Sequence, residues 1–302
     1  MANRDRTRRE ILGALGAGAA AASLAPAAVA SGVAAAASTV ALPTEIAPAT
    51  PQSPAIVLVH GTWHGGWVWR RVRRELQAAG YDVYAPTCTG CGERRHLMSP
   101  DVGLDTHITD IANVIEFEEL ERVVLVGHSF AGLTITGVAD RMRERIAHLV
   151  YFDALVPSAG RMSGVARKPD GSFPEYWDKR REKFIEGYQM DFFSEYPMAM
   201  LMPEDRIEDI EWMRRRITPH PSRGWSDALV LRNGGYEGLP RSFIRCVGQI
   251  YSPTSDNMVG IALTDPGFQM INVPFARNAM VTNPREIAGL LASMTTQSAA
   301  AG

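Results

Sequence analysis

Hydrophobic residues in this chain gather in short continuous runs separated by segments with helical spacing. The run that begins at Ala55 has the length of a strand, and such runs are typical of strands buried on both faces of a parallel sheet. The pattern predicts strands at 55–60, 82–85, 123–126, 147–152, 242–247 and 269–273, and helices at 69–79, 106–116, 130–143 and 284–294. Strands that alternate with helices in this way indicate an α/β fold with a mostly parallel sheet flanked by helices.

The alternation stops at Pro157 and resumes only near Ser242. Residues 158–240 are richer in charged and aromatic side chains than the rest of the chain. The simplest account is one α/β domain over 54–302, with a helical insertion at about 158–240 that folds over it as a cap. The length of 302 residues allows one large domain of this kind.

The N-terminus has the pattern of an export signal. Arg8 and Arg9 stand in a basic stretch, and no charged residue follows from Ile11 to Thr44. A basic region, an apolar Ala- and Gly-rich region and a small-x-small site resemble a bacterial twin-arginine signal at 1–30, followed by a linker at 31–53. The alternative is an Ala-rich tail on a cytoplasmic protein. A stable membrane span is not expected, because Ala and Gly insert poorly and Pro26 interrupts the run.

Composition excludes several classes of partner. The formal net charge of -2 gives no basic excess for binding nucleic acid. No metal-ligand spacing, phosphate loop or dinucleotide fingerprint is present, so no cofactor is predicted. The spacing of Cys88 and Cys91 allows a local disulfide in an exported protein and otherwise leaves two loop thiols, so their bonding is left open. The oligomeric state is left open.

The strongest chemical motif surrounds Ser129. It lies where the predicted strand at 123–126 must turn sharply into the helix at 130–143, with Gly127 and Ala131 as small neighbours. A nucleophilic serine on a strained strand-to-helix turn has this context, and the N–H of Phe130 then faces a developing oxyanion. The alternative is a serine that caps the helix.

A second motif, His60-Gly61-Thr62, follows the first predicted strand and places the N–H of Thr62 opposite that of Phe130. Both motifs stand at the carboxyl ends of parallel strands, where α/β proteins bind ligands. Together they predict an oxyanion hole, which a merely capping serine does not need.

These motifs resemble the α/β-hydrolase superfamily from about 55 to 294. Within it, the segments 58–67, 84–97, 104–108, 151–157, 265–268 and 278–284 resemble the branch that holds methyl-ester esterases, hydroxynitrile lyases and many actinobacterial hydrolase-like proteins. The resemblance implies an acid and a histidine that complete a triad with Ser129. Asp153, after the strand at 147–152, is the first candidate acid, and Asp256 is the second.

The histidine position departs from the family pattern. Members of the branch read Gly-His-Asn/Asp-Ala-Met before the final helix, and here Arg277 stands at the histidine position before Asn278. An arginine stays protonated near neutral pH and cannot act as a general base. Ser129 therefore lacks the family's proton acceptor.

Three functions remain open. An esterase would take its base from His64 or His128, both of which also fit structural roles. A non-hydrolytic enzyme, such as a lyase, a cyclase or a catalyst of C–C bond formation, would use the oxyanion hole and the Arg277 cation to polarise a carbonyl or phenolate. A ligand-binding protein without catalysis is the third. We favour the second, acting on a bulky apolar small molecule, which suits a cap with four methionines (Met190, Met198, Met200, Met202), although these also fit as core filling.

Overall fold

The structure is a computed structural model that describes residues 42–43, 45–158, 162–248, 261–262 and 264–300. At its centre lies a six-stranded sheet in the order β2-β1-β3-β4-β7-β8, in which every neighbouring pair is parallel. The strands are β1 (Ala55–Val59), β2 (Val83–Tyr84), β3 (Val123–His128), β4 (Ile146–Phe152), β7 (Arg241–Cys246) and β8 (Phe268–Val273). The α/β fold predicted from the hydrophobic pattern is confirmed.

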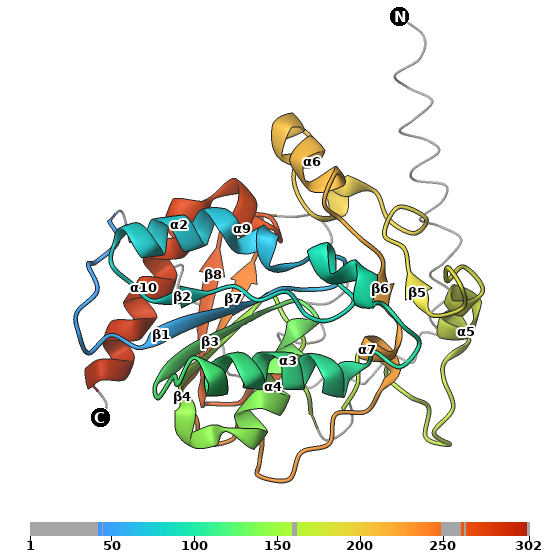
Figure 1. The fold of residues 1–302 in the computed structure, drawn as a ribbon, viewed down its shortest axis with the longest axis horizontal. Helices are drawn as coiled ribbons and strands as arrows, with labels where there is room; N and C mark the ends of the chain where they lie inside the picture. The colour runs from blue at the N-terminus through green and yellow to red at the C-terminus, as the bar shows by residue number, and fades with distance from the viewer. Residues whose placement is uncertain (1–41, 44, 159–161, 249–260, 263, 301–302) are drawn as a thin grey trace, which may run out of the picture. The chain divides into compact units, whose positions relative to one another are not determined.

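Helices cover both faces of the sheet (Figure 1). On one face lie α2 (Arg70–Ala78) and α10 (Pro284–Ala300), which pack together with the short α9 (Ala279–Thr282). On the other lie α3 (Leu104–Phe117) and α4 (Ala131–Arg141). Each face buries its own apolar cluster, which explains why the strands read as continuous hydrophobic runs rather than as alternating ones.

Between β4 and β7, the described residues (153–158 and 162–240) form only short elements. They are α5 (Glu175–Arg181), β5 (Gln189–Met190), α6 (Ile207–Arg214), β6 (His220–Pro221), α7 (Arg223–Ser226) and a 3-10 helix at Met198–Met200. Three further 3-10 helices lie before this segment, at Gly66–Trp69, Gly92–Leu97 and Arg143–Arg145. The strands β5 and β6 pair antiparallel, a ribbon that the helical expectation for 158–240 did not include. Strands of two residues leave no periodicity in the sequence that could reveal them.

Element ends differ from the predicted ranges by a few residues, for local reasons. The helix predicted at 106–116 begins at Leu104, because the Thr106 hydroxyl accepts the otherwise unpaired N–H of Gly103 at 3.3 Å. Cys88 and Cys91 are buried and unbonded, so the structure shows two loop thiols. No helix in the described part of the chain is long and apolar enough to cross a membrane.

Candidate active site

Ser129 occupies the turn between β3 and α4 with a left-handed backbone, φ = 59°. This conformation is strained for a residue with a side chain, and such strain is typical of functional turns. Two glycines make the turn sterically feasible. A Cβ at Gly61 would lie 2.8 Å from the Cβ of Ser129, and one at Gly132 would lie 1.9 Å from the carbonyl oxygen of Leu155. The turn therefore fits closely between β1 and the segment after β4.

Arg277, four residues beyond the end of β8, bridges the serine and a carboxylate. Its Nη2 donates to Ser129 Oγ at 2.6 Å, and its Nη1 donates to Asp153 Oδ2 at 2.8 Å. The side chains of Arg277 and Asp153 are only 8% and 0% exposed. In so dry an environment each charge needs the other, and the carboxylate holds the guanidinium in a fixed orientation.

The direction of these hydrogen bonds decides what Ser129 can do. A guanidinium has N–H donors and no acceptor, so Ser129 Oγ can only accept from Arg277. The serine proton must then point elsewhere, and Ser129 lines a cavity in which a ligand acceptor can lie. Ser129 is arranged to donate a hydrogen bond to a ligand, and Arg277 makes that hydroxyl a stronger donor.

Both ring nitrogens of His64 already make hydrogen bonds, to Thr62 and Asn278. Its Nδ1 lies 2.7 Å from the carbonyl oxygen of Thr62 and must carry the proton, which leaves Nε2 to accept from Asn278 Nδ2 at 3.2 Å. Burial, together with the neighbouring His60, lowers the pKa of His64 to about 3. The ring is neutral near pH 7, and its lone pair points at Asn278 rather than at Ser129.

His128 precedes the serine and lines the same cavity. Burial, and then the positive charge of Arg277, hold the pKa of His128 well below its ordinary value. Its ring packs edge-on against Trp69 and Phe152 at centroid distances of 6.4 and 5.9 Å. Neither sequence-predicted substitute for the missing base therefore has the electrostatic surroundings of a proton acceptor.

Of the two residues predicted as oxyanion donors, Phe130 directly follows Ser129, and Thr62 lines the same cavity as Ser129. Thr62 lies just beyond β1, and its hydroxyl accepts from the indole N–H of Trp225 at 2.9 Å, which holds the loop in place. Phe130 follows the serine, and its ring stacks on Trp225 at 5.6 Å. Within the described residues, the backbone N–H groups of Thr62 and Phe130 donate to no protein acceptor.

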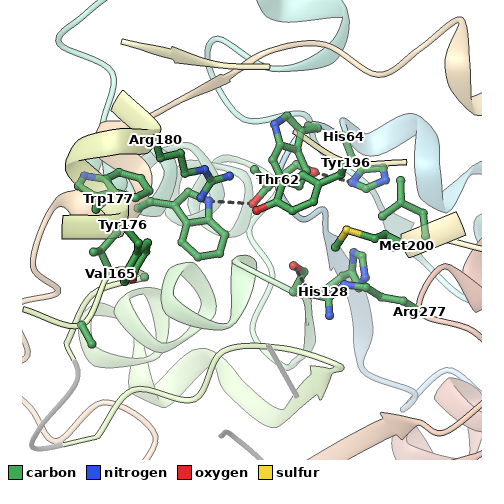
Figure 2. A pocket seen from close by; sticks show the side chains of 16 residues that line it. Thr62, His64, His128, Val165, Tyr176, Trp177, Arg180, Tyr196, Met200 and Arg277 are labelled. Atoms are coloured by element: carbon green, nitrogen blue, oxygen red, sulfur yellow. Dashed lines mark hydrogen bonds between the residues drawn. The ribbon is translucent and has the colours of Figure 1, made fainter. Parts of the chain in front are cut away.

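A cavity of about 400 Å³ opens above Ser129, a volume suited to a small organic ligand. It lies between the sheet loops and the segment at 158–240 (Figure 2). Its lining is mostly aromatic and apolar: Thr62, Trp63, His64, His128, Ser129, Gly164, Val165, Ala166, Tyr176, Trp177, Arg180, Tyr196, Met200, Leu201, Trp225 and Arg277. Of the four cap methionines only Met200 lines it, and the other three are core residues.

Sequence reasoning placed Ser129, Arg277, Asp153 and Thr62 at one site, and the structure brings these four side chains together. Asp256 lies outside the described residues. Asn278, Trp225 and Arg180 were not singled out. Asn278 stands in the family-like Asn-Ala-Met segment, a signal that could have found it, whereas Trp225 and Arg180 lie in a segment with no recognisable motif.

Comparison with known proteins identifies the family and agrees with the fold. The model of the alpha/beta hydrolase family matches residues 56–289, most of the chain. The chain belongs to the α/β-hydrolase family. This α/β-hydrolase is 37% identical over 243 residues to the carbendazim hydrolyzing esterase of Nocardioides sp. (strain SG-4G), a match that covers 79% of this chain and 98% of that protein. It is also 26% identical to methylesterase 3 of Arabidopsis thaliana, over 78% of this chain and 94% of that one.

Solved structures show the same fold. An extracellular α/β-hydrolase from a Paenibacillus species superimposes with a TM-score of 0.63 at 20% identity, covering 81% of this chain and 98% of that one. Tomato methylketone synthase I in complex with 2-tridecanone gives a TM-score of 0.61 at 18% identity, covering 82% and 99%. The α/β-hydrolase membership makes this chain an enzyme of that family, and its relatives include esterases.

Proposed function

We propose that this α/β-hydrolase catalyses a non-hydrolytic reaction at a substrate carbonyl or phenol, as a lyase, a cyclase or a catalyst of C–C bond formation. One observation carries the proposal: Arg277 donates to both Ser129 Oγ and Asp153, at the place where the family pattern has the histidine. The triad's acid and serine are kept, and its base is replaced by a permanent cation.

Hydrolysis through an acyl-enzyme needs a group that removes the serine proton and later returns it to the leaving group. Arg277 can do neither. The neutral, low-pKa rings of His64 and His128 do not replace it. A positioned base contributes about 10²–10⁴-fold to such reactions, and the site lacks that contribution.

The same site is well built to stabilise negative charge on oxygen. In the proposed binding mode, a carbonyl oxygen above Ser129 accepts from the serine O–H and from the N–H groups of Thr62 and Phe130, while Arg277 donates to the serine oxygen. For a β-hydroxy carbonyl substrate, cleavage of the C–C bond next to that carbonyl leaves its electron pair as an enolate whose charge rests on this oxygen. The other fragment leaves as an aldehyde or ketone, its hydroxyl proton goes to solvent water, and water returns a proton to the enolate carbon. Fixed donors in a dry cavity stabilise such an enolate without having to reorganise.

The size and lining of the cavity support a bulky apolar substrate. About 400 Å³ of mostly aromatic and aliphatic walls favours a ring system or a long chain over a small polar metabolite. No group of three or more His, Cys, Asp or Glu side chains that could hold a metal ion occurs among the described residues.

The test uses 4-nitrophenol as a reporter of charge stabilisation. Its visible absorbance distinguishes the bound phenolate from the phenol, so a titration gives the pKa of the bound ligand. A nearby fixed cation lowers the pKa of an acid by about 1–3 units, and we expect a shift of this size in the wild type. Arg277→Gln should abolish the shift, and Arg277→Lys should keep part of it. A bound pKa equal to that in water would contradict the proposal.

A serine carboxylesterase or lactone hydrolase that uses another base is the second candidate. It is favoured by the 37% identity to a protein named as a hydrolyzing esterase. This candidate predicts rapid wild-type hydrolysis of 4-nitrophenyl butyrate that is lost in Ser129→Ala and in His128→Gln. A binding protein without catalysis would instead shift the nitrophenol pKa and turn over no carbonyl substrate.

A further inference from the structure

The cavity contains a second cation, Arg180, that the chemistry at Ser129 does not use. Arg180 lies in α5, and Figure 2 shows Arg180 and Arg277 toward opposite sides of the lining side chains. Both line the cavity, and no carboxylate does so in the described part of the chain. The carboxylates that pair with these arginines are buried: the side chain of Asp153, which pairs with Arg277, is 0% exposed, and that of Glu195, which pairs with Arg180, is 8% exposed. The cavity therefore presents positive charge at both ends.

The guanidinium of Arg180 is held in an aromatic cage. Its central carbon lies 5.4 Å from the ring centroid of Trp177, 5.7 Å from Tyr196, 5.9 Å from Trp225 and 6.0 Å from Trp63. Contacts of this kind fix a cation in a dry site and leave its hydrogen-bonding edge free. The four rings surround the guanidinium of Arg180.

Arg180 makes a hydrogen bond through Nε and none through its two terminal nitrogens to the described residues. Its Nε donates to the carboxylate of Glu195. Among the described residues, neither terminal nitrogen donates to the protein, and Nη2 is buried without a partner. A buried donor with no acceptor is costly, and the paired terminal nitrogens of arginine match the two oxygens of a carboxylate.

We propose that Arg180 binds a carboxylate of the substrate. The ligand class is an apolar or aromatic carboxylic acid whose reacting carbonyl or phenol lies at the opposite end, over Ser129. The inference deepens the proposed function, because it names the substrate class of that same site. The carboxylate takes no part in bond making or breaking; it is an anchor that orients the apolar body between the two arginines.

The experiment measures binding alone, by isothermal titration calorimetry, with 2-naphthoate and its neutral match 2-naphthamide. A charge-assisted hydrogen bond in a dry site is worth about tenfold or more in affinity, so we expect the wild type to prefer the naphthoate by at least about tenfold. Arg180→Met should bring the two dissociation constants to within about twofold. Arg216→Met is the matched control, because Arg216 lies over the Trp212 ring at 4.6 Å but does not line the cavity.

Glu195→Gln provides a variant that a structural role of Arg180 would not explain. It removes the competing carboxylate and should strengthen the preference for naphthoate, whereas a merely structural ion pair predicts no gain. Circular dichroism checks that each variant is folded. Three results would each overturn the assignment. The first is a wild type that binds naphthoate and naphthamide equally well, and the second is an Arg180→Met variant that keeps the wild-type ratio of the two dissociation constants. The third is a ratio that is lost in Arg277→Gln and not in Arg180→Met.

These binding results stand apart from those with nitrophenol. A site that shifts the nitrophenol pKa but ignores the naphthoate charge would refute the Arg180 anchor and leave the proposed function intact. A site that selects naphthoate through Arg180 but hydrolyses esters rapidly would refute the proposed reaction and leave the anchor intact.

Discussion

Replacing Arg277 with histidine should turn this site toward ester hydrolysis. Arg277 now contacts Ser129 Oγ at 2.6 Å and Asp153 Oδ2 at 2.8 Å, so both partners of a triad base are already in place. An imidazole between them would accept the serine proton at one nitrogen and be oriented by the carboxylate at the other. The buried Asp153 would also favour the protonated ring that forms during the reaction.

The expected gain is set by the value of a positioned base, about 10²–10⁴-fold. We expect the lower end, about 10²-fold, because an imidazole is shorter than an arginine side chain and the loop before α9 must settle inward for the ring to span both contacts. The variant also loses a buried ion pair, and removing one partner of such a pair costs about 3–5 kcal/mol of unfolding free energy. Partial protonation of the new histidine beside Asp153 should reduce that cost.

The assay follows release of 4-nitrophenolate from 4-nitrophenyl butyrate at neutral pH. Arg277→Gln is the matched control, since it removes the same cation and supplies no base. Adding Ser129→Ala to Arg277→His should abolish the gain if the serine is the nucleophile. The reasoning fails if folded Arg277→His is no faster than Arg277→Gln, or if the wild type already hydrolyses the ester rapidly through Ser129.

Three further predictions concern stability and processing. Gly61→Ala should lower the unfolding free energy by about 1–3 kcal/mol in a urea titration, because its Cβ would lie 2.8 Å from that of Ser129, whereas Gly289→Ala within α10 should not destabilise; equal stability of both variants would contradict the close fit. Burial lowers the pKa of His60 to about 4 and of His64 to about 3, so below about pH 6.5 the unfolded chain binds more protons than the folded one. The unfolding free energy should therefore fall as the pH is lowered from 6.5 to 5, by up to about 1.4 kcal/mol per pH unit for each such histidine. A urea midpoint that does not change over this range would be inconsistent with neutral buried rings. Mass spectrometry of protein from the native host should find a mature N-terminus near Ser31, and an intact Met1 or Ala2 in the cytoplasm would refute export.

The fold was predictable because its signals are local and strong. The core of β3 is a run of apolar residues long enough for one strand. The glycines near Ser129 indicate a sharp turn, because a side chain at these positions would not fit there. The ribbon of β5 and β6 was not predictable, because each strand has two residues and their pairing depends on the tertiary packing of the segment around them. The predicted helix ends differ from the observed ones by a few residues, because capping interactions such as that of Gly103 set where a helix begins.

The site was predictable where residues follow strand ends in a recognisable order, as Thr62, Ser129 and Asp153 do. The position of Arg277 came from a family-like register, and its two hydrogen bonds required coordinates. Arg180 could not be found, because it stands in the run Lys179-Arg180-Arg181, which resembles a solvated helix face. Its ion pair with the buried side chain of Glu195 and its packing against Trp177 of the same helix and against Trp63, Tyr196 and Trp225 distinguish it from its exposed neighbours.

The hydrogen bond from Arg277 to Ser129 also bears on how such a protein can be detected. Fluorophosphonate reagents label serine hydrolases in whole cells by trapping an oxygen that a neighbouring base has made nucleophilic. Here the oxygen accepts from a cation that can take no proton, so we expect the reagent to react slowly, if at all, with Ser129. Surveys that use these reagents to count active members of the family would pass over this protein, and others with arginine at this position, even in cells where they are abundant and working.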